Sequence, residues 1–183
     1  MSRNYSCGNY QIEVIEDSLY ALNSVDNVRQ YDEIYLDEDS YTVFGIRVLR
    51  DNLKVKSAII GSNQGATTLH DTAMVIEDDR LVICCSDSIF SLSIPSLSLL
   101  WRTRADFSTC FEIFQHKDCY IIHGELTISM IDRNGHILWQ HGGRDIFTTV
   151  DGRDDFTITN DYILATDWNN EKYKFDFNGN IIK

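Results

Sequence analysis

Residues Met130 to Trp139 read MIDRNGHILW and give the clearest indication of the fold. A strand-like apolar segment passes through Asp-Arg-Asn-Gly into a second strand-like segment that ends in tryptophan. Asn and Gly accept a positive φ at little cost, so this step is typical of a tight turn between two strands. Two other stretches share the layout: SLSIPSLSLLW at residues 91–101 and KFDFNGNII at residues 174–182.

These stretches form an internal repeat. Aligned without a gap, the first two place Trp101 against Trp139, 38 residues apart, and the last two place Gly135 against Gly179, 44 residues apart. Apolar and polar residues alternate in short segments such as residues 10–14 and 173–175, which is typical of strands, and no long segment has helical spacing. A period near 40 residues with about four strands per unit is typical of β-propeller blades.

The alternation and the turns together predict the strands. In the three repeat units we expect strands at residues 73–77, 80–86, 89–94 and 98–102, then at 110–115, 118–123, 127–132 and 136–140, and finally at 155–159, 162–167, 172–176 and 180–183. In the less regular N-terminal part we expect strands at residues 10–15, 18–22, 33–36, 41–49 and 54–60.

The sequence therefore predicts an all-β protein with about four antiparallel, four-stranded blades, either a small β-propeller or a half-propeller. We expect a single domain over residues 1–183, with an irregular N-terminal blade or cap at 1–69 and repeat units at 70–106, 107–145 and 146–183. A closed ring of four blades is possible but would be sterically crowded. An open arc would leave sheet faces uncovered at both ends, and these need a cap, a second copy or a partner.

The turn and its tryptophan resemble the repeat of quinoprotein-like (PQQ-like) β-propellers, which runs apolar-apolar-Asp-x-x-Thr/Asn-Gly-x-x-x-Trp. The resemblance covers residues 70–183 and is best from Met130 to Trp139, whereas the first unit has Ile94 and Pro95 where Asp would stand. It implies that the turn and the tryptophan, here Trp101 and Trp139, lock neighbouring blades together. We do not predict a bound quinone from this resemblance. The enzymes of this type that bind the quinone are usually periplasmic, and this sequence shows neither an export signal nor their number of blades.

Composition narrows the classes of function. The apolar share is 43% and the formal net charge is −12, so phosphate backbones repel the chain and a basic partner is steered toward it. We see no signal peptide and no apolar run of membrane-spanning length, and we expect a soluble, cytoplasmic protein. The five cysteines include no CxxC pair, which argues against disulfides and a zinc site. We expect one of Cys84 and Cys85 to be buried and the other exposed.

No cluster of residues has a catalytic, metal-binding or cofactor-binding spacing, and we predict none of these sites. The five histidines form neither HxxxH nor HExxH. The alternative is an enzyme, a lyase or hydrolase, whose active site lies at the hub where the blades meet. It requires acids and bases from several blades, such as His70, His123 and Asp167, to converge, which sequence spacing cannot show.

The segment from Tyr31 to Tyr41 is the candidate binding site, since five carboxylates lie among three tyrosines within eleven residues. Tyrosine is favoured at interface cores, and carboxylates would match a basic patch. The alternative is an exposed edge strand that charge protects from aggregation. The candidate residues, with one tryptophan that could anchor a partner, are Tyr31, Asp32, Glu33, Tyr35, Asp37, Glu38, Asp39, Tyr41 and Trp168.

We therefore expect a non-enzymatic module that presents an acidic, tyrosine-containing surface to another protein with a basic surface. Its profile resembles that of the immunity proteins that neutralise bacterial toxins, especially basic nucleases. The alternatives are the hub enzyme and a structural half-propeller that completes a ring as a homodimer.

Overall fold

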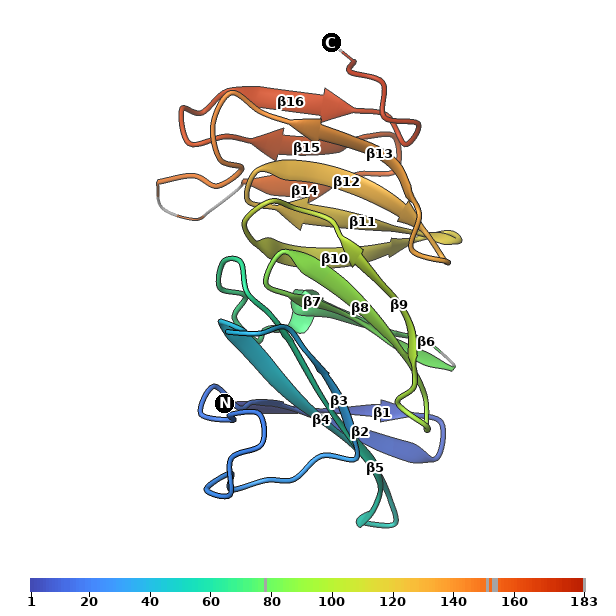
Figure 1. The fold of residues 1–183 in the computed structure, drawn as a ribbon. Coiled ribbons are helices and arrows are strands. Elements are labelled where there is room, and N and C mark those ends of the chain that lie inside the picture. The colour runs from blue at the N-terminus through green and yellow to red at the C-terminus, as the bar shows by residue number, and fades with distance from the viewer. Residues whose placement is uncertain (78, 151, 153–154, 183) are drawn as a thin grey trace.

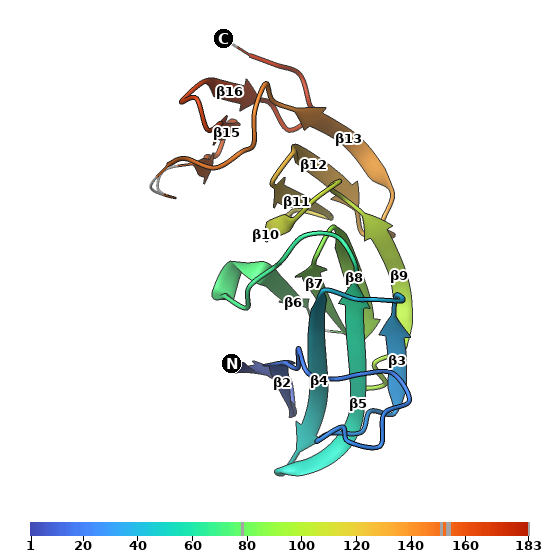
Figure 2. The same cartoon turned by 60° about the vertical axis from the view of Figure 1, so that its left-hand side comes forward.

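Four sheets follow one another along an open arc and do not close into a ring (Figures 1 and 2). The computed structural model describes residues 1–77, 79–150, 152 and 155–182. Figure 2 shows the outermost strands β3, β9 and β13 along the convex side of the arc, and β6 and β10 on its concave side. The all-β, propeller-like fold expected from the repeat is confirmed.

Each sheet is built from strands that are near neighbours in the sequence. In spatial order, the first sheet contains β1 (Ser2–Cys7), β2 (Tyr10–Glu16), β4 (Thr42–Arg50), β5 (Leu53–Ser62) and β3 (Glu33–Leu36). A short 3-10 helix, η1 (Asp71–Ala73), leads into the second sheet: β6 (Met74–Glu77), β7 (Arg80–Cys85), β8 (Ser88–Ser93) and β9 (Leu99–Arg104). The third contains β10 (Cys110–His116), β11 (Cys119–Gly124), β12 (Thr127–Asp132) and β13 (Ile137–Gly142), and the fourth β14 (Phe156–Ile158), β15 (Ile163–Thr166) and β16 (Lys172–Phe175).

The strands predicted in the repeat units are found within two residues of their expected bounds, except for the last one. At residues 180–183 we expected a strand, but Ile181 makes only an isolated bridge to Phe175, and Lys183 lies outside the described residues. The fourth sheet therefore has three strands. Within the described part of the chain, no helix has the length and apolar character of a membrane span.

The first sheet departs further from the prediction. The prediction of a strand at residues 18–22 is wrong. The chain turns twice there, since Tyr20 N donates to Asp17 O and Ser24 N donates to Ala21 O. Strand β1 was missed, because its sequence SRNYSC is polar and Cys7 is its one buried residue. Strand β3 pairs with β5 in parallel, so the blade is not purely antiparallel.

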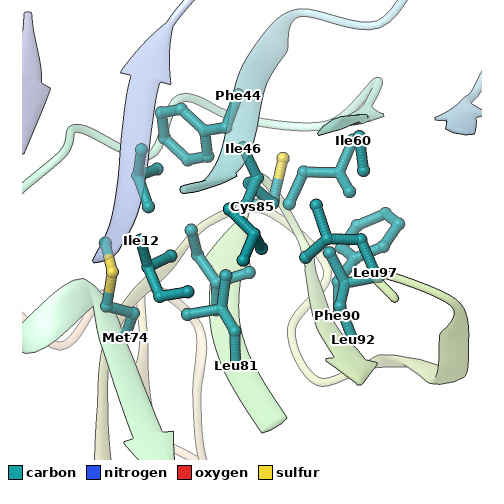
Figure 3. Close-up of a cluster of buried hydrophobic side chains, with 14 of the residues drawn as sticks. Ile12, Phe44, Ile46, Ile60, Met74, Leu81, Cys85, Phe90, Leu92 and Leu97 are labelled. Carbon is teal, nitrogen blue, oxygen red and sulfur yellow. The ribbon is translucent and has the colours of Figure 1, made fainter. Parts of the chain in front are cut away.

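The core lies between the sheets, in one cluster for each neighbouring pair. In the first cluster, Ile12, Phe44 and Ile46 of the first sheet meet Leu81 and Phe90 of the second (Figure 3). The second sheet is buried on both faces, so Cys84 and Cys85 are both fully buried, one toward each neighbouring sheet. Our expectation that one of them is exposed is wrong, since it assumed a sheet with one solvated face.

A tryptophan at the end of one sheet packs on a glycine of the next, as expected. Gly135 has φ +86°, and a Cβ atom there would lie 2.6 Å from the Trp101 ring. Trp101 Nε1 donates to Arg133 O at 3.0 Å. Trp139 repeats this arrangement, since Gly179 has φ +84° and lies against its ring. The turn therefore needs glycine both for its backbone conformation and to leave room for the ring.

Tyr35 makes the corresponding connection from the first sheet to the second. Its hydroxyl donates to Leu97 O at 3.2 Å and accepts from Leu99 N at 3.1 Å. This side chain belongs to β3, the outermost strand of its sheet, as Trp101 belongs to β9 and Trp139 to β13. One outer-strand aromatic residue thus ties each of the first three sheets to the sheet that follows.

Candidate protein-binding site

A groove opens between the loop that follows β2 and the loop that follows β3. Its volume is about 430 Å³, and we call it the acidic groove, lined by Tyr20, Ala21, Leu22, Leu36, Asp37, Glu38, Asp39, Ser40 and Val43. Leu36 and Val43 supply apolar surface, and the three carboxylates stand in sequence along one wall. The groove therefore contains part of the segment that the sequence singled out, next to a loop that the sequence had predicted to be a strand.

Three of the five carboxylates in that segment are used within the fold. Asp32 binds Lys54 Nζ at 3.2 Å, and Glu33 binds Lys56 Nζ at 2.7 Å. Asp37 accepts two bonds of 2.6 Å from the Arg102 guanidinium. These bonds hold the pKa of Asp37 below its usual range. Such carboxylates fix the edge strand β3 to its neighbours, as the alternative interpretation expects.

The other two carboxylates have no such role. Glu38 and Asp39 are exposed, and within the described part of the chain neither side chain makes an ion pair or a hydrogen bond. Both line the acidic groove. Because a carboxylate without an internal cation keeps its full attraction for an outside one, these two side chains are the part of the segment available to a basic partner.

Two of the three tyrosines serve packing. Tyr31 donates to Asp17 Oδ2 at 2.6 Å, and its ring covers Gly45, where any Cβ atom would collide with it. Burial and the bond to Asp17 raise the pKa of Tyr31. Tyr35 connects the first two sheets as described above. Tyr41 is 71% exposed and lines a second, more open groove with Phe111 and Glu125.

Trp168 does not join the other predicted residues. It lies in the turn between β15 and β16 of the fourth sheet, where its backbone N–H donates to Ile146 O. Its side chain is 43% exposed. The second and third sheets separate it from the segment of residues 31–41 (Figure 1). The nine predicted residues therefore do not form one continuous surface.

The sequence reading missed the most exposed apolar group. Residues 17–32, which we call the aliphatic loop, run over the outer side of the first sheet, where Tyr31 lies on Gly45 (Figure 1). The loop carries four aliphatic side chains that point into solvent: Leu19 (91% exposed), Leu22 (55%), Val25 (94%) and Val28 (89%). These four residues recur every third position. That spacing fits neither a half-buried strand nor an amphipathic helix, and it was the available signal.

At the inner side of the arc, two of the three residues named for a hub enzyme come together. His70 and His123 line a cavity of about 290 Å³ with Phe111, Glu112, Thr148, Gly152 and Asp155. Asp167 is absent from that lining, and its carboxylate instead accepts bonds from its own turn and from Tyr173. The convergence that the alternative requires is therefore partial.

His123 is held at both ring nitrogens. Nδ1 lies 2.9 Å from Glu112 Oε2, and Nε2 lies 2.8 Å from Phe147 O. Both ring nitrogens of His123 are therefore engaged in hydrogen bonds within the fold. Burial opposes the charge on Glu112, but its bonds to His123 and Thr72 outweigh burial and hold its pKa below the usual range. A histidine engaged in this way supports the structure and has no free nitrogen for a substrate.

No family model matches the sequence, and no curated protein matches it. Solved structures do match. The computationally designed Ika8 protein is 11% identical over 98% of this chain and 59% of its own, with a TM-score of 0.54. The AfRom2 CNH domain is 12% identical over 100% of this chain and 53% of its own, with a TM-score of 0.53. The designed Ika4 protein is 14% identical over 68% and 79%, with a TM-score of 0.51.

These likenesses define the class by fold alone: the chain has a β-propeller-like fold, shared with designed propeller proteins. It spans little more than half of two of the neighbours it matches. That share agrees with an arc of four sheets that does not close.

Proposed function

We propose that the protein is a non-enzymatic binding module whose partner is another protein with a basic surface. The observation that carries this proposal is that Glu38 and Asp39, on the wall of the acidic groove, make no ion pair with any described residue. The net charge of −12 would speed the approach of a basic partner, and the groove would fix where it docks. The quinoprotein-like repeat then supplies a scaffold, with no quinone bound.

Within this class we propose an immunity protein that neutralises a basic toxin such as a nuclease. Acidity supports it, as does the fact that no catalytic cluster is assembled among the residues that the structure describes, since such a protein acts by covering its target. A basic nuclease would meet the groove with the lysines and arginines that otherwise hold phosphates.

The test is capture of partners by the purified protein at low salt and at about 150 mM salt. A Glu38→Lys/Asp39→Lys variant should lose the partner that the wild type retains. Asp118→Lys/Asp161→Lys is the matched control, because both of these aspartates are exposed in turns of the third and fourth sheets. The proposal fails when no protein is retained at either salt concentration, or when both variants behave alike.

A hub enzyme, a lyase or hydrolase, is the second candidate, and the shared cavity of His70 and His123 favours it. His70 Nδ1 lies 3.0 Å from Thr72 Oγ1, which donates to Glu112 at 2.6 Å. This series of hydrogen bonds would leave His70 Nε2 as the proton acceptor, since both ring nitrogens of His123 are engaged in other hydrogen bonds. A substrate screen in which turnover appears and His70→Ala abolishes it would replace our proposal.

A further inference from the structure

The aliphatic loop exposes more apolar side chain than a surface loop needs. Leu19, Val25 and Val28 are each about nine-tenths exposed, and Leu22 is 55% exposed. Covering a leucine or valine side chain with apolar surface is favourable because it removes apolar area from water. Single exposed aliphatic side chains are ordinary, but four on one loop beside a groove are typical of interaction sites.

The loop holds its shape without these side chains. Asn27 bridges it, because Nδ2 donates to Ala21 O at 2.7 Å and to Ser24 O at 3.1 Å while Oδ1 accepts from Ala21 N at 2.9 Å. At the loop ends, Asp17 N donates to Val43 O at 3.1 Å and Asp17 accepts from the Tyr31 hydroxyl. The aliphatic side chains are therefore presented on a preformed frame, which lowers the entropy lost on binding.

We propose that the aliphatic loop inserts its side chains into an apolar depression on a protein partner, and that lysines or arginines around this depression pair with Glu38 and Asp39 in the adjacent acidic groove. The two surfaces are continuous, because Tyr20, Ala21 and Leu22 of the loop form one wall of the groove. This inference rests on the proposed function and adds the shape and chemistry of the partner.

Charge selects this occupant over others. Anionic lipid surfaces and nucleic acids would repel a chain with a net charge of −12. A second copy would bring its own Glu38 and Asp39 toward the same carboxylates across a symmetric contact. An apolar depression with a basic rim satisfies both surfaces at once.

The two surfaces should act on different rate constants. Buried aliphatic side chains set how long the complex lasts, whereas charges at the rim set how fast it forms and how strongly salt slows its formation. Binding kinetics therefore separate the loop from the carboxylates.

The experiment begins with a photo-crosslinking amino acid at Val25 and, as control, at Leu53, which is 73% exposed on the β4–β5 hairpin. The protein crosslinked from Val25 but not from Leu53 is identified, purified and tested by surface plasmon resonance. Flotation with anionic and zwitterionic vesicles and sedimentation of the free chain are run alongside.

We expect Leu19→Ser/Val25→Ser/Val28→Ser to raise the dissociation rate at least about tenfold with little change in the association rate. Glu38→Gln/Asp39→Asn should slow association several-fold and flatten its salt dependence. Because all five side chains are exposed, both variants should keep the wild-type unfolding midpoint.

The inference is overturned by an unchanged dissociation rate in the serine variant, by no crosslink from Val25, or by vesicle binding or self-association that depends on the loop. If only the serine variant behaves like the wild type, the proposed function survives and the loop inference alone fails. If neither variant changes the kinetics with a captured basic protein, both fail.

Discussion

Gly135 shows how one residue serves two neighbouring sheets. Its φ of +86° forms the turn, and its missing side chain makes room for the Trp101 ring. We expect Gly135→Ala to lower the free energy of unfolding by more than about 2 kcal/mol, because strain and a clash add. Gly8→Ala is the control, since Gly8 has φ +54° but nothing within 4 Å of the added atom.

Urea unfolding of the two variants measures the difference. Gly8→Ala should cost about 1 kcal/mol from the backbone alone. Equal losses in the two variants would mean that the Trp101 contact contributes nothing, and would remove the reason for the glycine in the repeat.

The lowered pKa of Glu112 predicts part of the pH dependence of the free energy of unfolding. Its pKa in the folded protein lies below its ordinary value of 4.5, so the unfolded chain binds its proton more tightly. The stabilisation is therefore present above that value and is lost as the pH falls through the lower, folded pKa. We expect the free energy of unfolding to fall less steeply with acid in Glu112→Gln than in the wild type.

Urea titrations from about pH 5 downward test this slope. Glu38→Gln serves as the control, because this exposed carboxylate has no ion-pair or hydrogen-bond partner among the described residues. Parallel curves for the wild type and Glu112→Gln would contradict the role assigned to the Glu112–His123 pair.

Strand β3 depends on long-range bonds because it is short, parallel and at an edge. The Asp37–Arg102 pair joins the end of β3 to β9 of the second sheet. Both side chains are 30% exposed, so solvent weakens the pair. A double-mutant cycle of Asp37→Ala and Arg102→Ala should give a coupling of about 1 kcal/mol that shrinks in high salt. Zero coupling at low salt would contradict this.

The elements also show what the sequence could and could not predict. Alternation and turn residues located the strands of the repeat units, because both signals are local. The parallel pairing of β3 was out of reach, since alternation does not encode strand direction. Leu19 and Leu22 looked like strand residues, but two successive turns leave them in solvent.

The candidate site, too, was predictable from the sequence only in part. Its acidic and aromatic composition was visible in the sequence, but which carboxylates stay free depends on cations far along the chain. Asp37 is neutralised by a residue 65 positions away, whereas its neighbour Glu38 is not. A local reading treats these two carboxylates as equivalent.

For the whole molecule, the two end faces of the arc predict a monomer. On the outer face of the first sheet, Arg47 pairs with Glu13 at 2.9 Å and Tyr31 covers Gly45. On the fourth sheet, Lys174 points away from the core, because its strand neighbours Tyr173 and Phe175 pack inward. Apart from the aliphatic loop, these end faces are polar and do not need a second copy to cover them.

Light scattering should therefore give 21.1 kDa for the free chain. A mass twice that value, independent of dilution, would support the homodimeric half-propeller instead. In that case the contact would have to replace the ion pairs on the end faces, and substitution of Lys174 by glutamate would be expected to change the mass.

The stacking of each sheet on only its immediate neighbours bears on how such a chain can evolve. A closed ring has room for a fixed number of sheets, so an additional sheet cannot be inserted without reopening it. An open arc is not limited in this way. Gene duplication of one unit could lengthen it, provided that the new turn offers a glycine to the preceding tryptophan.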